Sequence, residues 1–218
     1  FFLKILSSPM DPSRTLRIMN ESNILGRFIP DFQRVVGLIQ YDMYHYYTVD
    51  EHTIFTIHNI HLTKGGFLKN ISPFASEAIL KIKSFRSLIV AMFLHDIAKG
   101  REGDHSKNGA EISKKLCPRL GLDKDETETI AWLILNHLLL SKIAFRYDLN
   151  DRKIIENCSK IIKTPERLRL LLILTVCDIK SVGPEVWNDW KGALIHELYL
   201  KIMDNVSEKL PLKKEKLK

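Results

Sequence analysis

The sequence has few cysteines and no long hydrophobic run. Its three cysteines, Cys117, Cys158 and Cys177, lie far apart without a C-x-x-C pair, which argues against a disulfide framework and against a zinc knuckle. The longest apolar runs, Leu88–Leu94 and Leu170–Cys177, are far too short to span a bilayer. A signal-peptide pattern is also missing. We therefore expect a cytoplasmic protein that has no membrane partner.

Clustered positive charge is scarce outside the C-terminus. The net charge is +7, but residues 209–218 hold five Lys and one Glu and supply +4 of it, which leaves +3 for the rest of the chain. Aromatic residues do not alternate with basic ones, as a platform for stacking bases would require. We therefore expect no nucleic-acid partner, and we treat residues 201–218 as a helix end followed by a basic tail.

Alternating strand patterns and internal repeats are missing too, and almost every periodic segment indicates a helix. The chain begins at Phe1, within an apolar phrase, which suggests a fragment of a longer protein. We expect an all-α fold of one domain, in which residues 1–47 form a helical lead-in. Spacing and capping residues predict helices over residues 12–25, 30–43, 48–61, 75–82, 85–99, 106–116, 122–140, 151–162, 166–180 and 184–209.

The most informative stretch present is Leu88–Gly100, where seven apolar residues lead directly into His95 and Asp96. Such a run belongs in a core, yet a buried carboxylate is costly unless a partner compensates its charge. A metal ion suits an imidazole and a carboxylate side by side. The alternative is that these polar residues only mark the point where a helix reaches solvent.

Four more polar residues sit where an apolar pattern would not ask for them, each on a different predicted helix: His52, His105, His137 and Asp178. A lone histidine in a helix is more often a satisfied core or surface residue, and a carboxylate at the end of an apolar helix is usually its solvated end. Together with the His-Asp pair, however, they form the pattern of a mixed imidazole and carboxylate metal site in a helical bundle. These ligand types suit Mn, Fe, Mg or Zn.

A histidine, a His-Asp pair and an aspartate on successive helices resemble the HD superfamily of metal-dependent phosphohydrolases. The resemblance implies a helical bundle with a metal site in its core. It also implies that one metal ion is bound by His52, His95, Asp96 and Asp178. The intervening His105 and His137 match the histidines that hold a second metal ion in some members, and Asp96 could then bridge the two ions.

Longer phrases are similar to the HD region of bifunctional uridylyltransferase/uridylyl-removing enzymes, which modify the PII nitrogen-regulatory protein. They are Gly26–Phe32, Tyr47–Thr53, His95–Arg101 and Trp187–Lys191. The resemblance extends from about residue 1 to 200 and implies an HD domain over residues 48–200. In that family a nucleotidyltransferase domain precedes this region and ACT domains follow it. The transferase motif, Gly-Ser followed by paired Asp, is absent here.

The resemblance implies hydrolysis of the phosphodiester between UMP and a PII tyrosine, with Mg²⁺ or Mn²⁺ as cofactor and with Fe and Zn left open. Asp96 and Lys99 are the predicted catalytic residues, and Lys99 and Arg101 are predicted to bind the phosphate. The alternative for Lys99 is a surface lysine favoured by the helix dipole. Arg101 could equally be a solvated loop residue.

Three other functions fit parts of the same pattern. An HD phosphohydrolase that acts on a free nucleotide, such as a dNTP or an alarmone, would use the same ligands. A non-catalytic HD module could couple the neighbouring domains, although a degenerate domain has no reason to keep the complete ligand set. A helical nucleic-acid-binding domain would need binding that depends steeply on salt.

Overall fold

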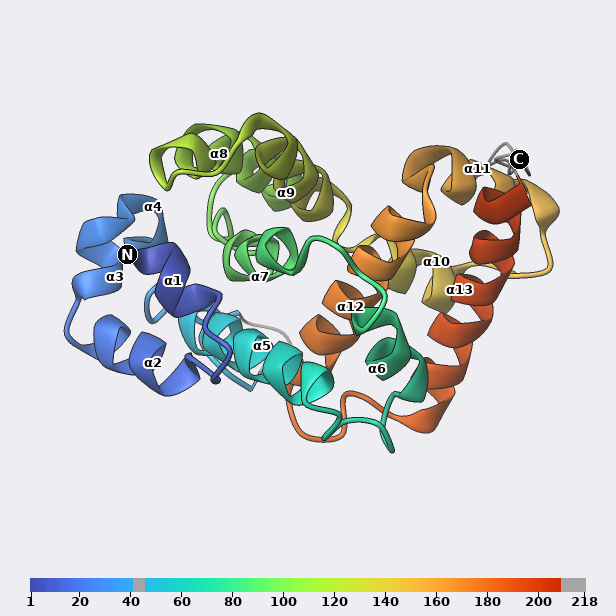
Figure 1. Cartoon of the computed structure of the whole chain (residues 1–218), viewed down its shortest axis with the longest axis horizontal. Coiled ribbons are helices and arrows are strands. Elements are labelled where there is room, and N and C mark those ends of the chain that lie inside the picture. The colour runs from blue at the N-terminus through green and yellow to red at the C-terminus, as the bar shows by residue number, and fades with distance from the viewer. Residues whose placement is uncertain (41–45, 209–218) are drawn as a thin grey trace, which may run out of the picture.

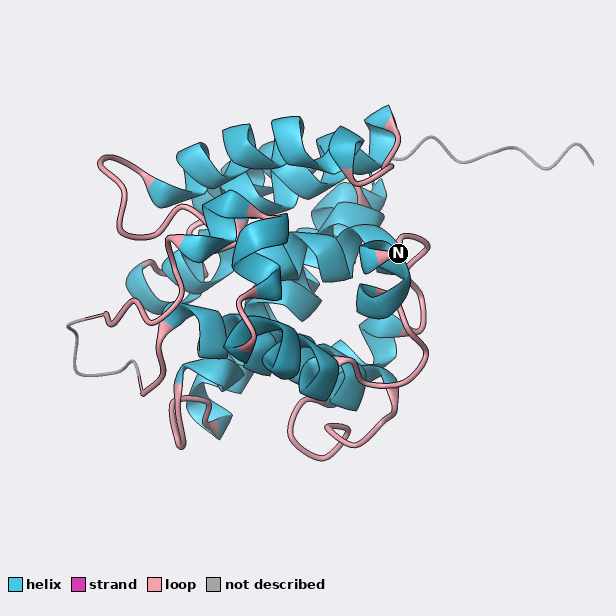
Figure 2. Cartoon of the chain, turned by 90° about the vertical axis from the view of Figure 1, so that its left-hand side faces the viewer, coloured by secondary structure: helices cyan, strands magenta, loops and turns pink. Residues whose placement is uncertain are grey.

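The structure, a computed structural model, describes residues 1–40 and 46–208, and within these ranges every regular element is an α-helix (Figure 1; Figure 2). This confirms the predicted all-α fold. The predicted basic tail, residues 209–218, and Met43 of the predicted second helix lie outside the described residues. The helices are α1 (Phe2–Leu6), α2 (Ser13–Glu21), α3 (Ile24–Phe28), α4 (Pro30–Gln33), α5 (Val49–Lys64), α6 (Pro73–Ile79), α7 (Phe85–Leu94), α8 (His105–Arg119), α9 (Lys124–Asn136), α10 (Leu139–Arg146), α11 (Arg152–Ile162), α12 (Pro165–Val182) and α13 (Asp189–Glu208).

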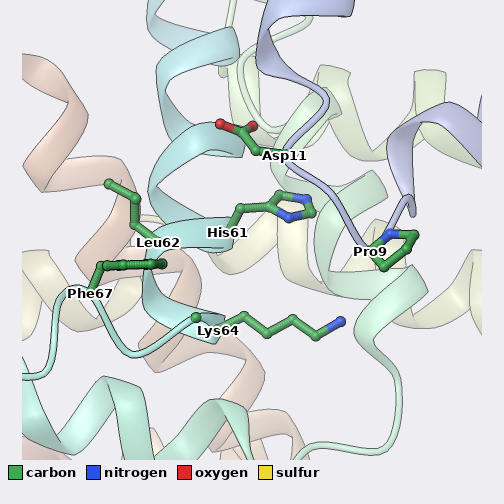
Figure 3. A pocket seen from close by; sticks show the side chains of 7 residues that line it. Pro9, Asp11, His61, Leu62, Lys64 and Phe67 are labelled. Carbon is green, nitrogen blue, oxygen red and sulfur yellow. The ribbon is translucent and has the colours of Figure 1, made fainter.

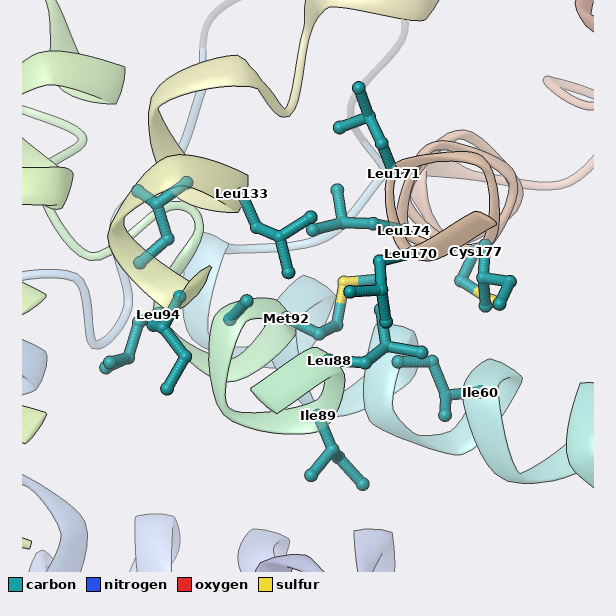
Figure 4. Close-up of a cluster of buried hydrophobic side chains, with 14 of the residues drawn as sticks. Ile60, Leu88, Ile89, Met92, Leu94, Leu133, Leu170, Leu171, Leu174 and Cys177 are labelled. Carbon is teal, nitrogen blue, oxygen red and sulfur yellow. The ribbon is translucent and has the colours of Figure 1, made fainter. Parts of the chain in front are cut away.

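Two helices that are apolar on nearly all sides, α7 and α12, form the centre of the core. Every residue of α7 from Ser87 to Leu94 is buried, and so is almost all of α12 from Leu168 to Ile179. A helix that is hydrophobic all round is stable only when other helices surround it. Figure 4 shows their side chains in one cluster with Ile60 of α5 and Leu133 of α9.

The remaining helices surround this centre. α5 packs against both α7 and α12, and α9 packs against α7 and α8. The short helices α1 to α4 lie at one end of the molecule, and α11 and α13 lie at the other (Figure 1). This arrangement brings the start of α5, the C-terminal ends of α7 and α9, the start of α8 and the C-terminal part of α12 to one place.

The predicted central helix ends at Leu94, earlier than expected, and the His-Asp pair follows it in a series of tight turns. The amides of Ile97 and Lys99 donate to the carbonyls three residues before them. The ring of His95 explains the ending, because its Nδ1 lies 2.7 Å from the Met92 carbonyl that a continuing helix would use. The predicted helix over residues 85–99 was therefore too long, and Lys99 lies in the turns that follow α7.

The predicted helix over residues 122–140 is two helices, and the break between α9 and α10 has the same cause. His137 caps α9, and its Nδ1 lies 2.7 Å from the Ile134 carbonyl, again three residues earlier. By length and composition alone, Lys124–Arg146 could cross a membrane. In the fold this stretch is interrupted at His137 and packs against α7, α8 and α13.

Some of the other predicted helix ends match the structure and others do not. Asp104 caps α8 as predicted, because its carboxylate accepts from the amides of Ser106 and Lys107. Residues 34–37 form turns in place of the predicted helix, with Gly37 at a φ of +69°. The last helix begins at Asp189, five residues later than the predicted start at Pro184.

Candidate metal centre

The structure brings the six predicted metal ligands together. They come from α5, the turn after α7, the start of α8, the end of α9 and α12. Two groups of three each place one ligand atom per residue within 4.8 Å of the others. We call His52, His95 and Asp178 the first triad, and Asp96, His105 and His137 the second triad.

The first triad is arranged around one carboxylate oxygen. Oδ1 of Asp178 lies 3.0 Å from Nε2 of His52 and 3.5 Å from Nε2 of His95. Both rings are fully buried, whereas the Asp178 side chain is 15% exposed. The arrangement offers two imidazole nitrogens and one carboxylate oxygen to the same point in space.

The second triad lies beside the first, and Asp96 connects the two. Nε2 of His105 and Nε2 of His137 are 3.4 Å apart, and they lie 3.8 and 3.9 Å from Oδ1 of Asp96. The other oxygen, Oδ2, lies 3.1 Å from Nε2 of His95 and 3.7 Å from Nε2 of His52. One carboxylate therefore presents an oxygen to each set of histidines.

Three of the histidine rings are oriented by backbone carbonyls. Nδ1 of His52 lies 3.1 Å from the Ser181 carbonyl, and Nδ1 of His95 and of His137 each lie 2.7 Å from the carbonyl three residues earlier. A carbonyl only accepts, so Nδ1 carries the hydrogen and Nε2 is left with a lone pair in the neutral ring. This is how histidines that bind metal ions are usually held.

Two ligand atoms of the centre are buried without a hydrogen-bond partner among the described residues. They are Nε2 of His95 and Oδ2 of Asp96, although the ammonium of Lys99 lies 2.6 Å from that oxygen without the alignment of a hydrogen bond. Burying such atoms without partners is costly. The four imidazoles of the donor set suit Zn and Fe, and its two carboxylates suit Mg²⁺ and Mn²⁺, so the donor set fits a divalent metal ion without selecting one.

The pKa values of the histidines in the centre are shifted in opposite directions. Burial favours a neutral His95 ring, but Asp96 and Asp178 outweigh burial and raise the pKa of His95 to about 10. Burial lowers the pKa of His137 to about 4, and it also lowers the pKa of His105. The two carboxylates are buried as well, yet their cationic and histidine neighbours hold both pKa values below the usual range. The carboxylates therefore stay ionised and attract positive charge.

The two predicted phosphate-binding residues have different surroundings. Lys99 lies at the centre, where its Nζ pairs with Asp96 and donates to Oε1 of Gln40 at 3.1 Å. Arg101 instead forms an ion pair with Asp31 of α4. Lys99 is thus placed beside the clustered ligands. The ion pair between Arg101 and Asp31 connects the loop after α7 to the N-terminal helices.

Sequence reasoning missed the residues that hold this geometry. Nδ2 of Asn59 donates to Oγ of Ser181 at 2.7 Å and so joins α5 to α12 beside His52. Asn59 follows His52 by seven residues, a spacing that places both on one helix face and could have identified it. Asp50, predicted only as a first-turn residue, is buried and accepts from Asn20.

Comparison with known proteins places this centre in a family. Residues 74–181 match the family model described as the HD domain. This chain contains an HD domain. The matched residues include five of the six clustered side chains, and the sixth, His52, precedes the match on α5.

Curated relatives extend the likeness of this HD domain over nearly the whole chain. They are named bifunctional uridylyltransferase/uridylyl-removing enzyme and come from Azospirillum brasilense (56% identical over 198 residues), Novosphingobium aromaticivorans (54% over 199) and Rhodospirillum rubrum (52% over 198). Each alignment covers 91% of this chain but only 21–22% of the relative. The chain therefore spans about a fifth of the length of these proteins.

A separate pocket of about 390 Å³ lies along the end of α5 and shares no residue with the HD-domain centre (Figure 3). Its lining includes Asp11, His61 and Lys64. Nε2 of His61 is buried without a hydrogen-bond partner among the described residues, and burial lowers the pKa of this ring. Asp11 pairs with Nδ1 of His58 at 2.5 Å and so fastens the segment after α1 to α5.

Proposed function

We propose that this chain hydrolyses the phosphodiester that links UMP to a tyrosine of a PII signalling protein, releasing UMP and unmodified protein. The observation that carries the proposal is the pair of triads that meet at Asp96. The names of the relatives support the choice of substrate. We assign only the removing activity to these residues, because the sequence has no Gly-Ser followed by paired Asp.

We propose that the first triad, with Oδ2 of Asp96, holds one divalent metal ion and that the second triad holds another. Asp96 would bridge them, since its two oxygens face different triads. Mg²⁺ and Mn²⁺ are the proposed ions, and Fe and Zn suit the same donors. A bound divalent ion supplies charge that polarises a phosphoryl oxygen and lowers the pKa of a coordinated water from about 15.7 toward 7.

The protein's own groups would position the phosphodiester and compensate its charge. We propose that Lys99 turns its ammonium from Asp96 toward a non-bridging phosphate oxygen, where it neutralises negative charge in the transition state. The leaving group is a tyrosine phenol with a pKa near 10, which departs more easily than an alkoxide. The exposed fractions of Asp178 (15%) and His105 (29%) leave a route from solvent to the centre.

For Arg101, phosphate binding stays a prediction, and its pairing with Asp31 offers a structural role instead. Comparing Arg101→Gln with Asp31→Asn separates the two roles. If Arg101 binds phosphate, only Arg101→Gln raises KM for the substrate. If the ion pair matters for structure, both variants lower the free energy of unfolding equally and leave KM unchanged.

We propose residues 48–200 as the functional HD unit, residues 1–47 as a lead-in and residues 201–218 as a helix end and tail. The start at residue 48 is supported by His52, which lies in the first triad although it precedes the family match. Because the relatives are about five times longer, we propose a cytoplasmic parent protein that also carries nucleotidyltransferase and ACT domains.

The deciding experiment measures UMP release from uridylylated PII by the purified chain with Mn²⁺, with dNTPs and alarmones tested in parallel. Release that requires both the metal ion and Asp96 supports the proposal. Turnover of a free nucleotide without release from PII would contradict the substrate but keep a hydrolytic HD domain. Metal binding without turnover of any substrate would leave the non-catalytic coupling module as the better explanation.

A further inference from the structure

A small pocket borders the metal centre on the side where α5 and α12 are joined. It has a volume of about 230 Å³, below the range of about 300–1,000 Å³ that is typical for drug-sized ligands, and so suits a single ring. Its lining is Tyr47, Phe55, Asn59, Lys180, Ser181, Gly183, Pro184, Glu185 and Trp187. We propose that this pocket binds the uracil base of the substrate, an inference that rests on the proposed function.

The first argument is position. The carbonyl of Ser181, a lining residue, accepts from Nδ1 of His52, so the pocket and the first triad share a hydrogen bond. Asn59 lies two helical turns after His52 on the same face of α5, which corresponds to about 10 Å along the helix. A nucleotide has this reach from its phosphate to the far edge of its base. A phosphate at the first triad therefore brings the base to Asn59.

The second argument is the fixed orientation of the Asn59 amide. Ser181 has a single hydroxyl hydrogen, and its Oγ donates it to the Cys177 carbonyl at 2.7 Å. The same Oγ can then only accept from Asn59, at 2.7 Å, so Nδ2 must face Ser181. Among the described residues nothing donates to Oδ1 of Asn59, although the residue is only 5% exposed.

A fixed acceptor on the pocket wall selects the ligand. This amide oxygen has no donor among the described residues, so it is available to accept an N–H from a ligand in the pocket. Uracil has an N–H at N3, whereas N3 of cytosine is an acceptor. The amide of Asn59 therefore favours uracil, and methylation at N3 removes the group that it would recognise.

The third argument is the aromatic wall. The rings of Tyr47 and Phe55 are stacked, with centroids 4.8 Å apart and an interplanar angle of 20°. Both rings are only partly buried and line the pocket, so a planar base can extend the stack. Stacking on aromatic side chains is tolerant of base identity, and the hydrogen bond to Asn59 would supply the selectivity.

The test measures equilibrium binding to the 218-residue chain by calorimetry, in Mg²⁺ and again in EDTA. The ligands are UMP, 3-methyl-UMP, which lacks the N3 hydrogen, and ribose 5-phosphate, which lacks the base. We expect 3-methyl-UMP and ribose 5-phosphate to bind at least tenfold more weakly than UMP. Equal affinities for UMP and 3-methyl-UMP would overturn the proposal.

A matched pair of variants tests the pocket itself. Phe55→Leu should weaken UMP binding severalfold and leave ribose 5-phosphate unchanged, because only the base contacts the ring. Phe145→Leu makes the same substitution on α10, outside this pocket, and should leave both affinities unchanged. Identical UMP affinities in the two variants would also contradict the proposal.

The outcomes separate this inference from the proposed function. Hydrolysis of uridylylated PII together with equal binding of UMP and 3-methyl-UMP would overturn the base pocket alone. A preference for UMP that depends on Phe55, without hydrolysis of uridylylated PII, would support the pocket and overturn the proposed reaction.

Discussion

At the scale of single residues, Asp96 is the point on which both triads converge. Its oxygens face different sets of histidines, and Lys99 lies 2.6 Å from one of them. It is almost completely buried, so no water layer shields these interactions. A change at Asp96 should therefore affect both proposed ions, whereas a change at His105 affects the second triad first.

Asp96→Asn should abolish UMP release while keeping the shape of the side chain. Loss of the bridging charge removes several kcal/mol of transition-state stabilisation, or at least about 10³-fold in rate. Release of UMP and equilibrium binding of Mn²⁺ are the two measurements. Asp125→Asn, at an exposed carboxylate in the first turn of α9, is the matched control and should behave as wild type. Full activity of Asp96→Asn would rule out the proposed bridging role.

Lys99→Gln should lower kcat for UMP release by about 10²-fold, the typical cost of losing one charge-stabilising group. Mn²⁺ affinity should stay the same or rise, because a cation that competes for Asp96 is removed. Lys107→Gln, at an exposed lysine of α8, controls for the loss of charge. An unchanged kcat with altered Mn²⁺ affinity would show that Lys99 only balances the charge of Asp96.

At the scale of elements, the ligand types could be predicted from the sequence because histidines and aspartates recur on successive predicted helices, and His95, Asp96, His137 and Asp178 lie within or at the end of apolar runs. The geometry around them could not. His95 and His137 end their helices by donating to a carbonyl three residues earlier, and helical periodicity carries no signal for that. Pairings such as Asn59 with Ser181 join residues 122 positions apart, so they depend on how α5 meets α12.

The second triad depends on how firmly α9 is held. Asp123 begins this helix with a capping box, in which its side chain accepts from the Glu126 amide and the Glu126 side chain accepts from the Asp123 amide. Because His137 lies at the other end of the same helix, fraying at Asp123 should destabilise α9 without changing any metal ligand.

Asp123→Ala should lower the free energy of unfolding by about 1 kcal/mol, the usual cost of losing an N-cap. Urea denaturation measures the change. Asp125→Ala removes the same charge from the same turn without removing a cap. Comparing the two variants therefore separates the loss of the capping hydrogen bonds from the loss of a favourable interaction with the helix dipole. Equal losses in the two variants would attribute the effect to charge alone.

At the scale of the whole molecule, the ligands come from five separate helices or helix ends, so a bound ion would connect most of the core. Binding to the folded state alone stabilises it by about 2.7 kcal/mol when the free ion is at 100 times its Kd. We therefore expect Mn²⁺ to raise Tm and EDTA to reverse the shift, as measured by calorimetry. Asp96→Asn should show a much smaller shift, and an equal shift would place the bound ion elsewhere.

The attachment of the N-terminal segment should depend on pH through Asp11. Burial raises the pKa of this carboxyl, but hydrogen bonds from His58 and Ser13 outweigh burial, and the pKa falls below the usual 3.8. A depressed pKa means that the stabilisation is present above the unfolded-state value and is lost as the pH falls below it. Urea unfolding from pH 6 to 2.5 should therefore show a shallower loss of stability in Asp11→Asn than in wild type. Parallel curves would contradict this role.

The first triad joins His52 to Asp178 across 126 residues of sequence. A ribosome that adds about 5–20 residues per second needs roughly 6–25 s to make the intervening chain. During that interval the other four ligands, His95, Asp96, His105 and His137, are added to the chain, but the first triad is still incomplete. Capture of a metal ion by the first triad would therefore have to wait until α12 has been made, and a product truncated before α12 would emerge without this half of the centre.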